Sequence, residues 1–264
     1  MTERYAVIGN PVAHSQSPAI HARFAELTGR KIAYERIEAP LDGFEPAVAA
    51  FREAGGRGLN VTLPFKQAAF RYCEESSDRA RAAQAVNTLV FADRVRGDNT
   101  DGIGLVRDLE INLALPLRGK SVLLLGAGGA AQGVVGSLVE AKIARLVIAN
   151  RTFAKAAELA ARFKPAHAVP YEELKGAFDV VINATSAGLG GEAIVMPAGM
   201  LDKNTVAYDM VYGRDTAFLE LARRAGARCS DGLGMLVEQA AESFFIWHGV
   251  RPATRAVLAS LRGD

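Results

Sequence analysis

The chain has 264 residues, of which half are apolar and 23% are charged, and its formal net charge is +2 at pH 7. This composition is typical of a globular protein and excludes a disordered or fibrous chain. A net charge this small also argues against a nucleic-acid-binding surface, so we expect no nucleic-acid partner.

Cysteine and histidine are sparse in this sequence. Cys73 and Cys229 lie far apart, which suits free, buried thiols in a reducing cytoplasm rather than a disulfide framework. The four histidines include no pair at metal-ligand spacing, so we predict no metal site. The first residues lead directly into an apolar, strand-like run, without the basic and long apolar segments of a signal peptide. We therefore expect a cytoplasmic protein.

Short apolar strands alternate with amphipathic helices in the first part of the chain. The pattern predicts a strand over 5–9, a helix from about Ser17, a strand over 34–37, a helix over 44–54 and a strand over 58–63. Ser17 is the expected N-cap of its helix, with Pro18 in the first turn. A β-rich segment over 86–95 then leads into a polar loop, and a helix is expected from about Gly102.

A second alternating run follows from Ser121. It predicts strands over 121–126, 145–150, 179–185 and 205–211, helices over 129–142 and 153–163, and two C-terminal helices over 233–262. Such alternation predicts a parallel sheet with helices on both faces. The uncharged stretch 121–139 is close to membrane-spanning length, but its apolar run breaks into a glycine-rich turn. A buried strand that turns into a helix explains it better, so we predict no membrane span.

A glycine-rich turn between a strand and a helix indicates a dinucleotide site. The turn from Gly126 to Ala131 fits the pattern G-x-G-x-x-A, in which the glycines let the backbone approach a pyrophosphate at the helix N-terminus. The next strand usually ends in a carboxylate when the cofactor is NAD. Here it is followed by Arg151, whose guanidinium suits the 2′-phosphate of NADP(H). The alternative for Arg151 is an exposed residue at the start of a helix.

Three polar clusters each follow a predicted strand, at residues 15–18, 60–66 and 99–102. Open α/β sheets bind ligands outside the carboxyl ends of their strands. The clusters supply hydroxyls, amides, one lysine and one carboxylate, which suits a hydroxylated ligand with a carboxylate of its own. Taken singly, each cluster is more often a helix cap or a turn.

At these positions the sequence resembles the shikimate dehydrogenase family along essentially its whole length. The motifs that carry the resemblance are Gly9-Asn10-Pro11, Ser15-x-Ser17-Pro18 with His21, Asn60-Val61-Thr62-x-Pro64-Phe65-Lys66, Ala85-Val86-Asn87-Thr88, Gly97 to Gly102, the glycine turn, Asn150-Arg151-Thr152, Asn183-Ala184-Thr185-Ser186-x-Gly188, Asp209-Met210-x-Tyr212, and Asp231-Gly232-x-Gly234-Met235-Leu236-Val237-x-Gln239-Ala240.

The resemblance implies an α/β protein of two domains. Residues 1–101 plus 236–264 would form a substrate-binding catalytic domain, and residues 102–235 an inserted Rossmann-type domain that binds NADP(H). It implies the reversible, NADPH-dependent reduction of 3-dehydroshikimate to shikimate, on the route to chorismate and the aromatic amino acids. The partners would be these small molecules, with no nucleic acid and no membrane, and the protein could be a monomer or a homodimer.

The resemblance also implies roles for individual residues. Lys66 and Asp101 would lie at the reacting centre. The substrate would be held by Ser15, Ser17, Asn60, Thr62, Lys66, Asn87, Asp101, Tyr212 and Gln239. The cofactor would be contacted by Asp78, Gly126, Ala127, Gly128, Gly129, Ala130, Asn150, Arg151, Thr152, Phe153, Ala154, Lys155, Met210 and Gly232. Asp78 is equally interpretable as part of a helix N-terminus.

Two questions stay open at this level. Lys66 could donate the proton to the reduced ketone, or it could mainly orient hydroxyls and stabilise charge. The protein could also be a quinate/shikimate dehydrogenase with broader substrate or NAD use, or a ligand-sensing relative without catalysis. Because Lys66 and Asp101 are both present, the catalytic interpretation is favoured.

Overall fold

The computed structural model describes residues 2–185, 196–197 and 199–263. The chain forms two compact units: Met1–Gly104 with Leu236–Asp264, and Leu105–Met235. The predicted α/β fold of two domains, with the second inserted into the first, is confirmed. Helices α5 (Asp101–Arg107) and α9 (Leu233–His248) contain the two points at which the chain passes between the units.

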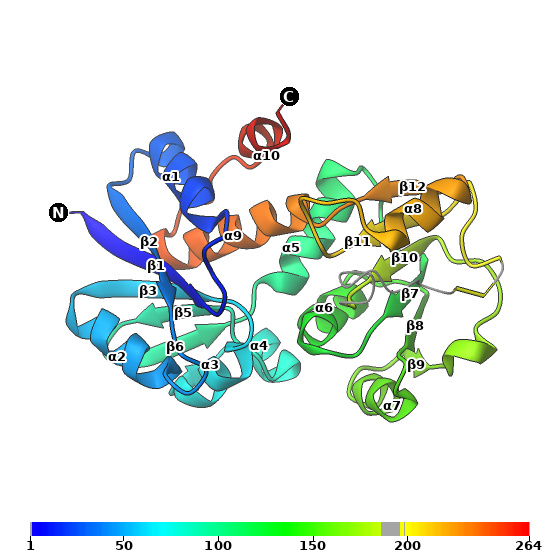
Figure 1. Ribbon diagram of the computed structural model, residues 1–264, viewed down its shortest axis with the longest axis horizontal. Helices are drawn as coiled ribbons and strands as arrows, with labels where there is room; N and C mark the ends of the chain where they lie inside the picture. The colour runs from blue at the N-terminus through cyan, green and yellow to red at the C-terminus, as the bar shows by residue number, and fades with distance from the viewer. Residues whose placement is uncertain (1, 186–195, 198, 264) are drawn as a thin grey trace. The chain divides into compact units, whose positions relative to one another are not determined.

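The first unit contains a six-stranded mixed sheet of order β2-β1-β3-β5-β6-β4 (Figure 1). Strand β1 pairs in parallel with β2 and β3, whereas β5 pairs antiparallel with β3 and β6. The β-rich segment predicted over 86–95 therefore holds β5 and the start of β6. The loop predicted from Arg96 onward is wrong for residues 96–98, because their backbone pairs with β5 as the second strand of a β-hairpin. The elements besides α5 and α9 are β1 (Glu3–Gly9), α1 (Ser17–Thr28), β2 (Ile32–Glu38), α2 (Phe44–Glu53), β3 (Gly56–Val61), α3 (Lys66–Tyr72), β4 (Glu75–Ser76), α4 (Asp78–Ala83), β5 (Thr88–Phe91), β6 (Val95–Asp98) and α10 (Arg255–Arg262).

Helices cover both faces of this sheet. Successive side chains of β1 point to opposite faces, so β1 contributes to the packing on each of them. Ala6 and Ile8 pack in one apolar cluster with Phe44 of α2. On the other face, Tyr5 stacks on Trp247 of α9 with the ring centroids 4.5 Å apart. Figure 1 shows α1 and α9 on one side of the sheet and α2 and α3 on the other. The C-terminal segment is thus part of the core of the first unit.

The second unit contains a six-stranded, wholly parallel sheet of order β12-β11-β10-β7-β8-β9. Helices α6 and α7 pack on one face, and α8 packs on the other. The predicted parallel sheet with helices on both faces is confirmed. The elements are a π-helical turn (Asp108–Asn112), β7 (Ser121–Leu125), α6 (Gly129–Glu140), β8 (Arg145–Ala149), α7 (Phe153–Ala161), β9 (Ala166–Ala168), a 3₁₀ turn (Tyr171–Glu173), β10 (Val180–Asn183), β11 (Val206–Asp209), α8 (Ala217–Arg224) and β12 (Arg228–Ser230).

Several local expectations need correction. Helix α1 begins at Ser17 itself, with Gln16 as the N-cap, so Ser17 lies one position inside the helix. The two cysteines are free but half-buried rather than buried. Cys73 follows the end of α3, where its thiol donates to the Phe70 carbonyl oxygen at 3.3 Å.

The uncharged segment 121–139 is β7 followed by most of α6. Within the described residues, no helix combines the length and hydropathy of a membrane span.

An aromatic cluster encloses His21 in the first unit. The imidazole is fully buried and stacks on the Tyr34 ring, with centroids 4.3 Å apart and planes 7° apart. Phe24, Phe244 and Trp247 surround it. Burial lowers the pKa of His21 from its ordinary value near 6.5 to about 3, because the charged imidazolium would lose its hydration there.

This burial predicts an acid sensitivity of the fold. Between pH 6.5 and 3 the unfolded chain binds a proton at His21 that the folded protein excludes, so the free energy of unfolding falls as the pH falls, by at most about 1.4 kcal/mol per pH unit. Urea unfolding of the wild type and of His21→Phe at pH 7, 5.5 and 4.5 measures this contribution. The wild type should lose more stability on acidification than the variant, and equal losses would refute the assignment.

Candidate functional site

Lys66 and Asp101 form an ion pair at the centre of a polar cluster in the first unit. Lys66 is the first residue of α3 and Asp101 is the first residue of α5. The Nζ of Lys66 lies 2.5 Å from Asp101 Oδ2, and the two side chains are 19% and 8% exposed. The structure therefore brings the two residues predicted for the reacting centre into direct contact, in a largely desolvated place where their attraction is strong.

The amide of Asn87 fixes the orientation of the Asp101 carboxylate. Asn87 is buried, and its Oδ1 accepts hydrogen bonds from the Thr100 backbone N–H and the Thr88 hydroxyl, both at 2.9 Å. Because the carbonyl end is occupied by donors, the NH₂ end faces Asp101 Oδ1 at 2.8 Å. The carboxylate is thus held by Lys66 on one oxygen and by Asn87 on the other.

The amide of Asn60, near the carboxyl end of β3, is held in the same way. Its Oδ1 accepts from the Tyr34 hydroxyl at 2.7 Å, and its Nδ2 donates to the Asn87 carbonyl at 3.2 Å and to Ser243 Oγ at 3.0 Å. Burial raises the pKa of Tyr34 well above its usual range, so the hydroxyl keeps its proton and remains a donor. The Asn60 side chain therefore has one preferred orientation.

The other predicted substrate residues of this unit lie around the start of α1, just after β3 and within α9. The hydroxyl of Ser15 donates to that of Ser17 at 3.2 Å, and the Ser15 carbonyl accepts from the Arg36 guanidinium at 2.6 Å. The Thr62 backbone N–H donates to Ile8 at the end of β1. Gln239 of α9 places its Oε1 3.3 Å from the Thr100 hydroxyl and 3.4 Å from Asn87 Nδ2. Gln239 thereby joins the network around Asp101.

Two further predicted site residues, Tyr212 and Asp78, belong to other parts of the structure. Tyr212 belongs to the second unit and is half-buried, and burial raises its pKa. Asp78 is the first residue of α4, with Ser77 as the N-cap, and its exposed carboxylate pairs with Arg81 one turn later. The helix-terminus interpretation of Asp78 therefore matches its surroundings, and a cofactor role for it stays a prediction.

The glycine turn of the second unit connects β7 to α6. Gly126 has a φ of +109°, and a Cβ there would lie 3.0 Å from the Ala184 carbonyl oxygen, so only glycine fits. Gly128 is the N-cap of α6, and a Cβ on it would meet no heavy atom within 4 Å. The backbone is thus open in front of the N-terminus of α6, whose free N–H groups suit an anion.

The segment after β8 lies beside this turn, because Ala149 pairs with Leu125 at the end of β7. Asn150 is half-buried, and its Nδ2 donates to the Thr152 carbonyl at 2.9 Å. The following residues are exposed: Arg151, Thr152, Phe153, Ala154 and Lys155. Two cationic side chains therefore reach solvent at the edge where a dinucleotide would end.

Met210 and Gly232 lie side by side on the other flank of β7. The Gly232 N–H donates to the Val211 carbonyl at 3.1 Å, and a Cβ on Gly232 would lie 2.4 Å from the Met210 carbonyl oxygen. A larger residue would push the two segments apart. Ser186 and Gly188 of the motif that begins at Asn183 lie outside the described residues.

Thr88, Thr100, Ser243 and Tyr34 belong to the polar network although no functional role was predicted for them. Thr88 and Thr100 stand inside motifs quoted from the sequence, and that position was the available signal. Ser243 lies on the apolar face of α9, fully buried, and its spacing gave no hint of a polar partner.

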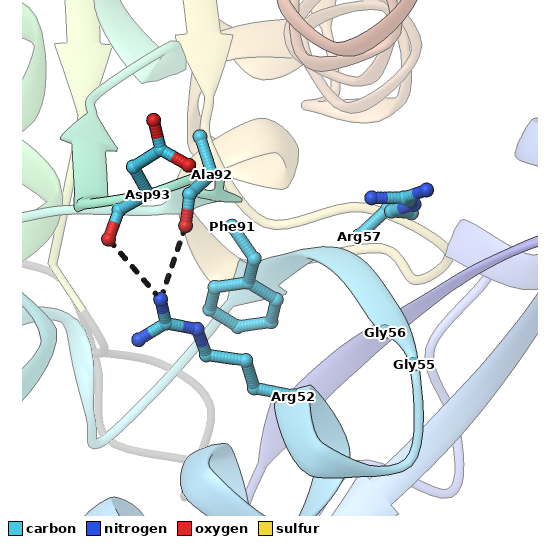
Figure 2. Close-up of a pocket in the computed structure, with 7 residues that line it drawn as sticks. All are labelled: Arg52, Gly55, Gly56, Arg57, Phe91, Ala92 and Asp93. Carbon is cyan, nitrogen blue, oxygen red and sulfur yellow. Dashed lines mark hydrogen bonds between the residues drawn. The ribbon is translucent and has the colours of Figure 1, made fainter.

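A pocket of about 500 Å³ lies at the opposite end of β3 from Asn60 (Figure 2). Gly56, the first residue of β3, lines it together with Arg52 and Asp93. The Arg52 guanidinium donates to the carbonyl oxygens of Ala92 and Asp93 at 3.0 and 3.4 Å. Its role is to hold the turn between β5 and β6, and none of the predicted site residues lines this pocket.

Comparisons with known proteins cover nearly the whole chain. The profile of the shikimate dehydrogenase substrate binding domain matches residues 7–89, that of shikimate/quinate 5-dehydrogenase matches 110–206, and that of the shikimate 5′-dehydrogenase C-terminal domain matches 232–262. The shikimate dehydrogenase (NADP(+)) of Aromatoleum aromaticum is 57% identical over 98% of this chain and 97% of its own, and that of Methylobacillus flagellatus is 55% identical over 98% and 99%. The chain belongs to the shikimate dehydrogenase family.

Several solved structures have the same fold. An Ael1 enzyme from Pseudomonas putida is 48% identical, covers 98% of both chains and has a TM-score of 0.93. Shikimate 5-dehydrogenase from Thermus thermophilus, solved in complex with NADP(H) and shikimate, is 36% identical, covers 99% of both chains and has a TM-score of 0.90. Shikimate 5-dehydrogenase from Listeria monocytogenes, solved with shikimate and NAD, is 27% identical over 98% of this chain and 96% of its own, with a TM-score of 0.87.

Proposed function

We propose that this protein is an NADP-dependent oxidoreductase that interconverts 3-dehydroshikimate and shikimate, a step toward chorismate and the aromatic amino acids. One observation carries the proposal: the Lys66–Asp101 pair is held by oriented amides in a chain 57% identical to a shikimate dehydrogenase (NADP(+)). The first unit, approximately residues 1–101 plus 236–264, is the substrate-binding domain, and residues 102–235 form the NADP-binding domain. We place the protein in the cytoplasm.

In this proposal the polar cluster of the first unit binds the hydroxylated ring. The hydroxyls and amides of this cluster come from Ser15, Ser17, Asn60, Thr62, Asn87 and Gln239. Tyr212 is proposed as a further substrate contact. These groups are neutral, and the side chains of Ser15, Asn60, Asn87 and Gln239 are already oriented by hydrogen bonds, so they need little reorganisation when a ligand binds. A ring that carries hydroxyls and a carboxylate matches this set of donors and acceptors.

The reacting oxygen is served by Lys66 and Asp101. When the ketone is reduced, its oxygen must gain a proton to become a hydroxyl. In the Lys66–Asp101 pair, the ammonium group at Lys66 Nζ is the proton donor. Asp101 keeps the ammonium in place and accepts a hydrogen bond from the substrate in its remaining lone pairs. If Lys66 instead only orients hydroxyls, its loss would weaken binding rather than slow the chemical step.

The second unit fits NADP(H). The cofactor supplies the hydride when bound. The open backbone at Gly128 and the N-terminus of α6 suit its pyrophosphate, and Arg151 with Lys155 suits the 2′-phosphate. The other proposed cofactor contacts lie at the same edge of the sheet. They are Gly126, Ala127, Gly129, Ala130, Asn150, Thr152, Phe153, Ala154, Met210 and Gly232.

A broader enzyme that oxidises quinate or accepts NAD is the second candidate. It is favoured by the match to a profile named for both shikimate and quinate, and by the Listeria relative solved with NAD. Purified protein should reduce NADP at 340 nm with shikimate, more slowly with quinate and more slowly with NAD. Comparable rates with quinate or NAD would favour the broader enzyme, and no reduction in any combination would refute both.

Removal of the lysine should separate proton transfer from binding. Lys66→Ala should lower kcat on the order of 10²- to 10⁴-fold, the usual contribution of a general acid, with little change in the KM for shikimate. Lys120→Ala is the matched control, because Lys120 also pairs with an aspartate, Asp179, at 3.0 Å, near the amino end of β7. Steady-state kinetics of both variants decide the role, and a change in KM alone would make Lys66 a binding residue.

Removal of the guanidinium should change cofactor choice. Arg151→Ala loses charged hydrogen bonds worth about 1.5 to 3 kcal/mol, so the KM for NADPH should rise roughly 10- to 100-fold while that for NADH stays nearly constant. Arg118→Ala is the control, because Arg118 is equally exposed but precedes β7. If Arg151→Ala shifts both cofactors equally, the guanidinium does not bind the 2′-phosphate.

A further inference from the structure

The segment that follows β11 carries two residues of the proposed site, and its shape depends on a buried carboxylate. Met210 and Tyr212 are proposed contacts to cofactor and substrate. Asp209, the last residue of β11, is fully buried. A carboxylate that has lost its hydration is costly unless hydrogen-bond donors replace the water, so the partners of Asp209 indicate what it holds in place.

The groups around the Asp209 carboxylate are hydrogen-bond donors: a backbone N–H, a hydroxyl and a side-chain amide. Oδ1 accepts from the Val211 backbone N–H at 3.0 Å, and Oδ2 accepts from the Thr216 hydroxyl at 2.6 Å and from Asn183 Nδ2 at 3.2 Å. A side chain that binds the N–H two residues later closes a tight turn. The bond to Val211 therefore bends the chain immediately before Tyr212.

The two other donors anchor this turn to the neighbouring elements. Thr216 is the N-cap of α8, where its hydroxyl also accepts from the Leu219 N–H. Asn183 ends β10, and its backbone carbonyl accepts from the Met210 N–H at 3.0 Å. The turn is closed from the far side by Gly232, whose N–H donates to the Val211 carbonyl. The segment is thus held at Met210, at Val211 and at its return into α8.

From this geometry we infer that Asp209 is a positioning residue, which fixes the Met210–Tyr212 segment in the shape that cofactor and substrate meet. The inference rests on the proposed function for the roles of Met210 and Tyr212. Asp209 itself touches neither ligand, because it is covered by its own protein partners. Loss of the carboxylate should leave the fold in place and loosen one turn.

The first test compares Asp209→Asn with wild type and with Leu219→Ala. The amide cannot serve Asn183 Nδ2 and Thr216 as the carboxylate does, so the turn should loosen. Leu219→Ala leaves a cavity beneath α8, where Leu219 is buried, and destabilises the same region without touching the turn. Amide hydrogen exchange of the ligand-free proteins, read on peptides that cover residues 209–216, should be faster in Asp209→Asn than in Leu219→Ala.

The second measurement is ligand binding and turnover. A misplaced contact segment should raise the Kd for NADPH in a fluorescence titration, and lower kcat/KM for shikimate, each on the order of 10-fold. Leu219→Ala should match wild type in both at a temperature well below its melting point. Wild-type exchange and binding in Asp209→Asn, or the same kinetic loss in Leu219→Ala, would overturn the inference.

Two variants at Thr216 provide an independent test if Asp209→Asn does not fold. Thr216→Ser keeps the hydroxyl that donates to Asp209 and should behave as wild type. Thr216→Val removes it at nearly constant volume and should reproduce the faster exchange and the weaker binding. Equal behaviour of the two variants would overturn the inference. If wild type itself neither binds NADPH nor oxidises shikimate, the proposed function fails, while the exchange comparison still tests whether Asp209 holds the turn.

Discussion

The polar cluster of the first unit depends on the orientation of one buried amide. The side-chain oxygen of Asn87, Oδ1, accepts from the Thr100 N–H and the Thr88 hydroxyl, so its NH₂ group must face the Asp101 carboxylate. That carboxylate in turn fixes the Lys66 ammonium. Hydrogen bonds in a buried network reinforce one another, and an unpaired member is costly. The geometry of the ion pair is therefore decided by residues that carry no charge.

The two units hold their sites by different physical means. In the first unit the polar groups are buried and already bonded to one another, so their positions are set before a ligand arrives. In the second unit the glycine turn is shaped by backbone constraints, whereas the side chains from Arg151 to Lys155 are exposed. Exposed cations attract anions over distances of about 8 Å at physiological ionic strength. The cluster of the first unit is therefore ordered by hydrogen bonds among its own side chains, whereas the segment after β8 in the second unit offers exposed cationic side chains.

Sequence reasoning found what periodicity and strand ends encode. The resemblance to the family implied the meeting of Lys66 with Asp101. Sequence reasoning from the residue patterns predicted the parallel sheet of the second unit, the strands β1, β2 and β3 of the first unit, and the glycine turn. It did not find the short edge strands β4, β9 and β12, whose two or three residues show no period. It also gave no role to Ser243, because a serine on an apolar helical face gains its partners, Asn60 and Thr88, only from tertiary packing. Buried hydrogen-bond networks are invisible to a linear pattern.

The first unit is interrupted in sequence, and this has a consequence for its synthesis. One face of its sheet is covered by α9, where Trp247 stacks on Tyr5 and Phe244 packs on Phe24. A nascent chain on the ribosome therefore exposes this aromatic face until α9 has been made, whereas the inserted unit is contiguous and can fold earlier. Transiently exposed apolar surface of this kind favours aggregation. The core of the first unit is thus completed only after the inserted unit has been made, when α9 closes over the sheet.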